Sequence, residues 1–170
     1  MGKNEPTRIL ITGATGRLGK IILEALNRDA YTVFAWGFNQ EGNWDEVCFR
    51  AVDITNKEAV KAAYQEARPD LVVHTAALAD VGRCANEPLR AIQLNTFGTD
   101  YLTQLVAEVA GVQMIFVSTT MVFDGTKGNY AEQAQPVPLS TYGWTKRIAE
   151  RSVSKHLGQR GLIIRLSLLY

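Results

Sequence analysis

Residues 9–19 constrain the fold more than any other segment, because they read as a buried strand, a glycine turn and the first turn of a helix. The apolar run 9–11 lacks polar alternation, which is typical of a parallel strand covered on both faces. We expect Gly13 to permit the tight exit from this strand, Gly16 to let a pyrophosphate approach bare backbone, and Gly19 to let the helix pack closely. The helix that starts here directs unpaired N–H groups toward the ligand. The segment therefore predicts a dinucleotide-binding turn.

The size and charge of the chain limit the classes of protein and the kinds of partner that are expected. Its 170 residues suffice for one domain with a sizeable core, and 46% hydrophobic and 21% charged residues are typical of a globular protein. A net charge of +1 gives no electrostatic reason to expect nucleic acid or an anionic membrane as a partner. The N-terminus lacks a signal pattern, and no apolar run is long enough to span a bilayer. Cys48 and Cys84 lie far apart without metal-ligand spacing, so we expect reduced thiols, no metal site and a cytoplasmic location.

Strand-like and helix-like segments alternate along the whole chain. Beyond the first strand, strands are expected at residues 31–36, 47–52, 71–75, 114–118 and 162–166. Helices are expected after the glycine turn and at residues 57–67, 88–110 and 140–156. Such alternation produces right-handed βαβ units. We therefore predict an α/β fold, a Rossmann-type doubly wound parallel sheet with helices on both faces and strand order 3-2-1-4-5-6, forming one NAD(P)-binding domain over residues 1–170.

The ligand of such a sheet lies across the carboxyl ends of strands one and four. The residues expected to converge there are the turn 13–19, Asp53, Ala76, Ala77, Ser118 and Thr119. An NAD site usually offers an acidic residue to the adenosine ribose at the end of strand two, where this chain has the uncharged residues 37–40. Arg17 is available near the turn, so NADP(H) is favoured, and NAD(H) stays the alternative.

Tyr142 and Lys146 stand four residues apart near the start of a predicted helix, and therefore lie on one helical face. A nearby ammonium and a cationic nicotinamide favour the phenolate, which makes a tyrosine useful as an acid or base at neutral pH. We expect Tyr142 to donate a proton to a substrate carbonyl, Lys146 to hydrogen-bond the nicotinamide ribose, and Thr119 to orient the carbonyl oxygen. Asn95 is polar on an apolar helix face, so we expect its amide to tie that helix to the active-site backbone or to hold a water.

The combined motifs resemble an extended short-chain dehydrogenase/reductase and, more narrowly, the dTDP-4-dehydrorhamnose reductase family. The segments that carry the resemblance are residues 12–19, 68–77, 93–95, 118–125 and 142–146. It implies reduction of the 4-keto group of a nucleotide-activated deoxysugar, with Thr119, Tyr142 and Lys146 as the catalytic group and Thr119 and Thr120 at the substrate. The cofactor contacts expected from the turn and from the resemblance are Gly13, Thr15, Gly16, Arg17, Leu18, Gly19, Asp53, Ile54, Thr75, Ala76, Ala77, Tyr142 and Lys146.

Members of the family continue beyond the position of residue 170 into a C-terminal region that supplies much of the sugar-nucleotide pocket. The resemblance therefore implies that this chain lacks the substrate region and is inactive on its own. It also implies a nucleotide-sugar partner, and helices such as 88–110 often pair across two-fold axes in the superfamily, so a homodimer is a further expectation.

Two alternatives to the reductase stay open. The first is a non-catalytic NADP-binding regulatory subunit similar to the β subunit of methionine adenosyltransferase, which resembles the same reductases. The second is a sugar-nucleotide epimerase or dehydratase of the same superfamily, although Thr120 does not offer the carboxylate that dehydratases place after the threonine.

Overall fold

The computed structural model of the protein describes residues 6–27, 29–39 and 47–167. Its strands form one six-stranded sheet in the order β3-β2-β1-β4-β5-β6, and every neighbouring pair is parallel. The predicted doubly wound order is therefore confirmed. The strands are β1 (Thr7–Thr12), β2 (Tyr31–Gly37), β3 (Cys48–Ala51), β4 (Leu71–His74), β5 (Gln113–Thr119) and β6 (Gly161–Leu166).

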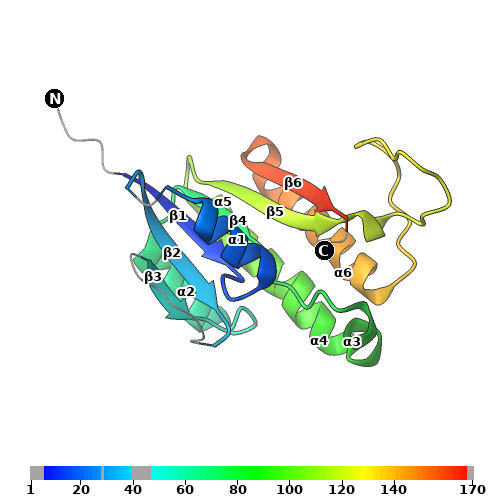
Figure 1. Cartoon of the computed structure of the whole chain (residues 1–170), viewed down its shortest axis with the longest axis horizontal. Helices are drawn as coiled ribbons and strands as arrows, with labels where there is room; N and C mark the ends of the chain where they lie inside the picture. The colour runs from blue at the N-terminus through cyan, green and yellow to red at the C-terminus, as the bar shows by residue number, and fades with distance from the viewer. Residues whose placement is uncertain (1–5, 28, 40–46, 168–170) are drawn as a thin grey trace.

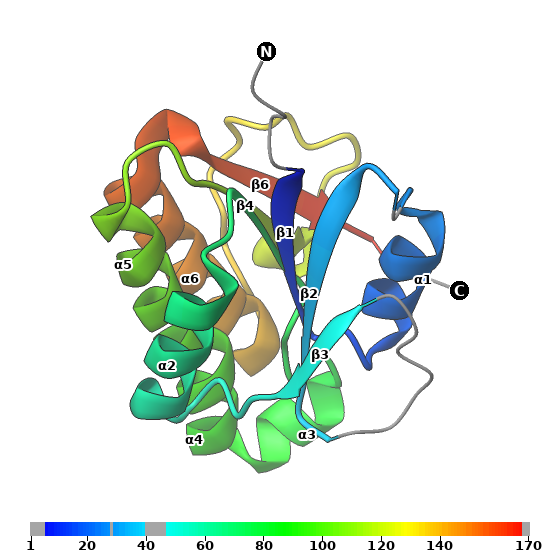
Figure 2. The ribbon, with the colours of Figure 1, turned by 90° about the vertical axis from the view of Figure 1, so that its left-hand side faces the viewer.

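Helices cover both faces of this sheet, as predicted. The helices α2, α5 and α6 pack on one face, α1 packs on the other, and α3 and α4 lie near the carboxyl ends of the strands (Figures 1 and 2). None of the described helices is long and apolar enough to cross a membrane. The helices are α1 (Arg17–Ala25), α2 (Lys57–Ala67), α3 (Val81–Asn86), α4 (Pro88–Ala91), the π-helix η1 (Ile92–Gly98), α5 (Thr99–Glu108), the 3-10 helix η2 (Thr120–Val122), α6 (Thr141–Leu157) and the 3-10 helix η3 (Gly158–Arg160).

Strand β1 shows how the sequence builds two cores. Side chains alternate across a strand, so Ile9 and Ile11 join the cluster under α1, whereas Leu10 joins the larger cluster under α2 and α5. All three are at most 4% exposed. The unbroken apolar run therefore reflects burial on both faces, as expected for a central parallel strand.

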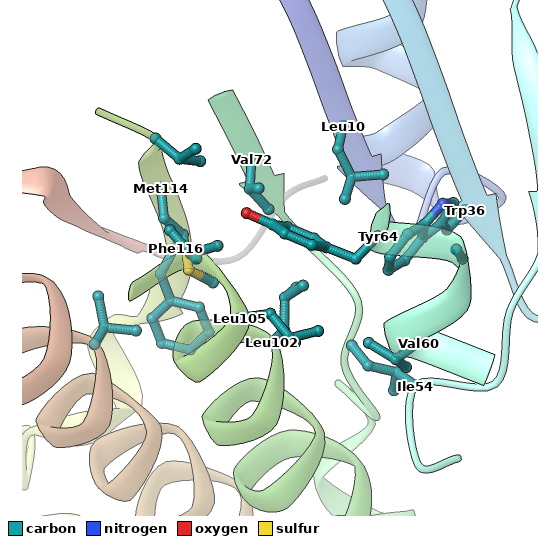
Figure 3. Packing of buried hydrophobic residues seen from close by; sticks show 14 of the residues in the cluster. Leu10, Trp36, Ile54, Val60, Tyr64, Val72, Leu102, Leu105, Met114 and Phe116 are labelled. Atoms are coloured by element: carbon teal, nitrogen blue, oxygen red, sulfur yellow. The ribbon is translucent and has the colours of Figure 1, made fainter. Parts of the chain in front are cut away.

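Tyr64 of α2 brings a polar atom into the larger core, and Figure 3 shows its hydroxyl pointing toward Val72. Among the residues that the structure describes, this hydroxyl is the buried side-chain polar atom without a hydrogen-bond partner. Burial raises the pKa of Tyr64 to about 12, against an opposing effect of Arg160. The phenol is therefore neutral, yet its desolvation is uncompensated.

We expect Tyr64→Phe to raise the free energy of unfolding by about 1 kcal/mol, because it removes an unpaired buried hydroxyl and keeps the ring. Urea denaturation measures the change. Tyr64→Leu is the control, since it removes the hydroxyl together with ring volume and should destabilise the protein. A loss of stability in Tyr64→Phe would show that the hydroxyl has a partner.

The predicted single helix over residues 88–110 is wrong in its detail. The segment instead runs as α4, η1 and α5, with a wide π-helical stretch in the middle and an end at Glu108. The wide stretch contains Asn95, whose carbonyl accepts a hydrogen bond from the Thr99 hydroxyl at 2.8 Å. Side-chain bonds to backbone carbonyls compete with regular helical pairing, and π-helical turns are frequent at functional sites.

Helix α3 has no counterpart in the sequence-based prediction. It has six residues, Val81–Asn86, and is capped by Asp80, whose carboxylate accepts a hydrogen bond from the Arg83 amide at 2.7 Å. Cys84 of α3 is buried and Cys48 is exposed, and both are free thiols, as expected. A helix this short has too few periodic positions to be recognised in a sequence.

Candidate active site

The glycine turn is built by close backbone approaches. Gly13 has φ of +71°, a left-handed conformation that side chains disfavour, and a Cβ atom there would lie 2.6 Å from the Ala76 nitrogen. A Cβ atom on Gly19 would lie 2.3 Å from the Gly13 carbonyl oxygen. The roles predicted for these two glycines, a tight exit from β1 and a close-packed helix, agree with this geometry.

The turn opens into a crevice of about 230 Å³ at the carboxyl ends of β1, β2 and β4. Eight of the predicted cofactor contacts line it, whereas Arg17, Leu18 and Gly19 of α1 and Tyr142 and Lys146 of α6 do not. The lining residues are Thr12, Gly13, Thr15, Gly16, Trp36, Gly37, Phe38, Val52, Asp53, Ile54, Thr75, Ala76, Ala77, Arg90 and Leu94.

Helix α1 offers its N-terminus to this crevice. Side chains of Asn56, Asp80 and Ser140 cap α2, α3 and α6, whereas Gly16, the residue before α1, provides no side-chain cap. Capping side chains satisfy the first N–H groups of a helix, and a phosphate can take their place. The cradle at Gly13 and the open start of α1 together fit the pyrophosphate of a dinucleotide.

The other end of the crevice fits an adenosine. Trp36 and Phe38 line it, and residues 37–39 carry no carboxylate, whereas Gln40 lies outside the described residues. Asp53 also lines it, and its Oδ1 accepts hydrogen bonds from the Thr55 backbone amide at 2.9 Å and the Thr55 hydroxyl at 2.7 Å. Arg90 of α4 adds a cation that sequence reasoning missed, because only the fold brings α4 to this crevice.

Tyr142 meets Thr119 because α6 approaches η2 closely. A Cβ atom on Gly143 would lie 2.3 Å from the Met121 carbonyl oxygen, so glycine permits this contact. Burial raises the pKa of Tyr142, the nearby Cys84 adds to the rise, and a hydrogen bond with Thr119 opposes it. This direction is opposite to the one expected from an ammonium and a nicotinamide cation together. In the protein alone, the phenol is therefore held in its protonated form.

Lys146 lies one turn further along α6 and is only 1% exposed. Its Nζ lies 4.1 Å from the centroid of the Phe116 ring on β5. Burial lowers the pKa of Lys146 to about 7, and the charge of Glu150 opposes this change. Lys146 therefore loses its proton near neutral pH, and it contacts the strand that ends at Thr119.

Asn95 performs the structural role expected of it. Its Oδ1 accepts from the Leu78 amide at 2.7 Å, and its Nδ2 donates to the Leu78 carbonyl at 3.0 Å. The same Nδ2 donates to the Thr145 hydroxyl at 3.1 Å. Asn95 therefore joins η1 to the segment after β4 and to the helix that carries Tyr142 and Lys146.

His74 at the end of β4 was missed by sequence reasoning, although it is completely buried. Its Nδ1 lies 2.6 Å from the Thr12 hydroxyl and its Nε2 lies 2.9 Å from the Thr99 hydroxyl. Because Thr99 donates its proton to Asn95, it accepts from Nε2, and Thr12 then donates to Nδ1. Burial and the charge of Lys146 lower the pKa of His74 to about 3, so the ring is neutral.

The described residues contain no group of three His, Cys, Asp or Glu side chains placed to hold a metal ion. The candidate site combines a glycine-lined crevice and an uncapped helix start with Thr119, Tyr142 and Lys146. The family described as the RmlD substrate binding domain matches residues 7–170. The chain belongs to this family.

Relatives of this RmlD-family chain include both a reductase and a subunit of a methionine adenosyltransferase. It is 36% identical to the dTDP-4-dehydrorhamnose reductase of Streptomyces griseus over 164 residues, which are 96% of this chain and 50% of the relative. It is 32% identical to the methionine adenosyltransferase 2 subunit beta of Xenopus laevis over 163 residues, 96% of this chain and 47% of the relative. The chain thus spans about half the length of the relatives it matches.

A solved structure supports the same assignment. The dTDP-4-dehydrorhamnose reductase of Bacillus anthracis in complex with NADP superposes with a TM-score of 0.87 and is 30% identical. The match covers 99% of this chain and 56% of the solved chain. The Rossmann-type fold is therefore shared with a reductase of this family.

Proposed function

We propose that this chain is the NADP(H)-binding part of a reductase that acts on the 4-keto group of a nucleotide-activated deoxysugar. The observation that carries the proposal is that Thr119, at the end of β5, meets Tyr142 near the start of α6, with Lys146 buried one turn further along the same helix. The dTDP-4-dehydrorhamnose reductases among its relatives support the substrate class. Measuring NADPH oxidation with keto-sugar nucleotides, in a chain of the relatives' full length, tests the proposal.

Each side chain of the proposed catalytic group has one task. The bound dinucleotide supplies the hydride. Tyr142 supplies the proton to the carbonyl oxygen, and the Thr119 hydroxyl, which lies beside that phenol, orients the same oxygen. Lys146 contributes positive charge, which stabilises the phenolate left after proton transfer. Burial keeps the phenol protonated, and this is the form that can donate a proton to the carbonyl oxygen during reduction.

A second candidate function is a regulatory subunit that binds NADP without turnover. It is favoured by the 32% identity to methionine adenosyltransferase 2 subunit beta over 96% of this chain. The same assay separates the two candidates, because tight NADPH binding without oxidation against any keto-sugar nucleotide would support the regulatory subunit. Measurable oxidation would support the reductase.

Cofactor preference gives a prediction that needs no substrate. We expect NADPH to bind at least about tenfold more tightly than NADH, a difference of about 1.4 kcal/mol, because residues 37–39 present no carboxylate to a 2′-phosphate. Isothermal titration calorimetry of the two cofactors measures this. Phe38→Asp adds a carboxylate at the exposed end of β2 and should reverse the preference, whereas Phe38→Asn, the uncharged control, should not. Equal affinities in the unsubstituted chain would contradict the prediction.

A further inference from the structure

A buried carboxylate lies behind the proposed catalytic lysine. Glu150 is 1% exposed and follows Lys146 by one turn of α6, so both side chains lie on one helical face. Arg165 of β6 donates to both carboxylate oxygens, from Nε at 2.8 Å and from its second terminal nitrogen at 2.8 Å. Ser118 donates to Oε1 at 2.7 Å and Arg147 donates to Oε2 at 3.1 Å. Four donated hydrogen bonds therefore fix the position of this charge.

One partner of Glu150, Ser118, adjoins the proposed site. Ser118 directly precedes Thr119, and it lies on the same face of β5 as Phe116, the ring that contacts the Lys146 ammonium. The Glu150 carboxylate therefore contacts β5, the strand that positions Thr119, and it lies on α6, the helix that positions Lys146. Replacing a buried ion pair by apolar residues is often neutral or stabilising, so stability alone does not explain why a buried carboxylate lies here.

We propose that Glu150 is a positioning residue for the reaction, which keeps the buried Lys146 ammonium charged, while Arg165 and Ser118 hold Glu150 in place. The inference rests on the proposed function of Lys146. Glu150 does not contact the crevice, and it acts on the chemistry only through the lysine.

The charges around Lys146 support this assignment. Burial alone would raise the pKa of Glu150, but hydrogen bonds from Arg165 and Ser118 and the Arg165 charge outweigh burial and hold it below its usual value. Glu150 is therefore an anion, and its charge opposes the loss of the proton from Lys146. The other ionisable groups facing this cluster are His74 on β4, Cys84 on α3, Tyr142 and Arg147 on α6, and Arg165 on β6. None of these supplies a negative charge at neutral pH, since the histidine, thiol and phenol are neutral.

The test measures the pH at which Lys146 loses its proton. NMR of the lysine Cε–Hε signals in the labelled chain monitors this titration, and Lys146→Met identifies the signal that belongs to Lys146. Glu150→Gln keeps the shape but removes the charge, and it should lower the titration midpoint by about one pH unit or more. Ser118→Ala is the matched control, because it removes one hydrogen bond and leaves the charge, so its shift should be much smaller. Glu150 would have no such role if the midpoint in a folded Glu150→Gln variant stayed unchanged or rose.

The sign of the shift separates the proposal from a merely structural role. Loosened packing admits water and moves the Lys146 midpoint up toward its ordinary value, whereas loss of a neighbouring anion moves it down. If Glu150→Gln alone fails to fold because it leaves Arg165 unpaired, Glu150→Met is introduced together with Arg165→Met and compared with Arg165→Met alone. The double variant should then have the lower midpoint, and an equal or higher one would overturn the proposal.

The titration uses neither cofactor nor substrate, so it stands apart from the proposed function. If Glu150→Gln lowers the midpoint but the full-length protein does not oxidise NADPH, the reductase assignment fails and the coupling between Glu150 and Lys146 remains. If the full-length protein is active, the pH above which the unsubstituted enzyme loses its rate should fall in Glu150→Gln by the same shift. An active enzyme with an unmoved pH profile would remove Glu150 from the reaction.

Discussion

Replacing Tyr142 by phenylalanine is expected to lower the rate of keto-sugar reduction by about 10²–10⁴-fold, the usual contribution of a positioned acid. Burial raises the pKa of Tyr142, so the phenol carries its proton at neutral pH beside Thr119. Phenylalanine keeps the ring, which packs near Leu78 and Cys84, and removes the proton. NADPH oxidation followed by absorbance in a full-length chain measures the loss.

The affinity for NADPH should change little in this variant, because the crevice is lined by other residues. Tyr101→Phe is the matched control, since Tyr101 is a half-buried phenol on α5 that lies outside the crevice. It should keep the unsubstituted rate. A Tyr142→Phe enzyme with that rate would exclude Tyr142 as the proton donor and would direct attention to a water or a substrate group.

The sheet could be predicted from the sequence because its signals are local. Each strand is a short apolar run, each crossover is a helical segment, and the handedness of crossovers leaves few arrangements. The signal for the glycine turn is also local, since a Cβ atom on Gly19 would meet Gly13 only six residues earlier. Asn95 could be singled out because a polar residue on an apolar face needs buried partners.

The remaining parts of the site depend on contacts between distant segments. Arg90 reaches the crevice only because α4 lies near the carboxyl ends of the strands (Figure 2), and the spacing of residues in the sequence does not predict this contact. Glu150 and Arg165 are ordinary charged residues in a helix and a strand, and their pairing at 2.8 Å is visible only after β6 joins β5. His74 looks like one more member of an apolar strand until Thr12 and Thr99 are placed at its two nitrogens.

Because His74 is neutral in its buried hydrogen-bonded chain, the protein is expected to lose stability as the pH falls below about 6.5, the ordinary pKa of histidine. The unfolded chain binds a proton at His74 below that pH, whereas the folded protein does so only near the lowered pKa of about 3. The free energy of unfolding should therefore fall by about 1.4 kcal/mol for each pH unit below this point. Lys146 does not contribute there, because it is protonated in both states below its folded pKa of about 7.

Urea denaturation between about pH 6 and 4.5 isolates this effect, since Lys146, with a folded pKa of about 7, titrates above this window. The carboxyl groups Glu87, Asp124 and Glu150, whose pKa values are lowered from 4.5, 3.8 and 4.5, contribute below it. His74→Gln should be less stable at neutral pH by about 1–3 kcal/mol, because it breaks the buried hydrogen bonds, but its stability should vary much less with pH. His156→Gln, which removes the chain's other histidine, is the control and should keep the slope of the unsubstituted protein. If His74→Gln retained that slope, the acid sensitivity would belong to another group, and the neutral Thr12–His74–Thr99 chain would not describe the folded state.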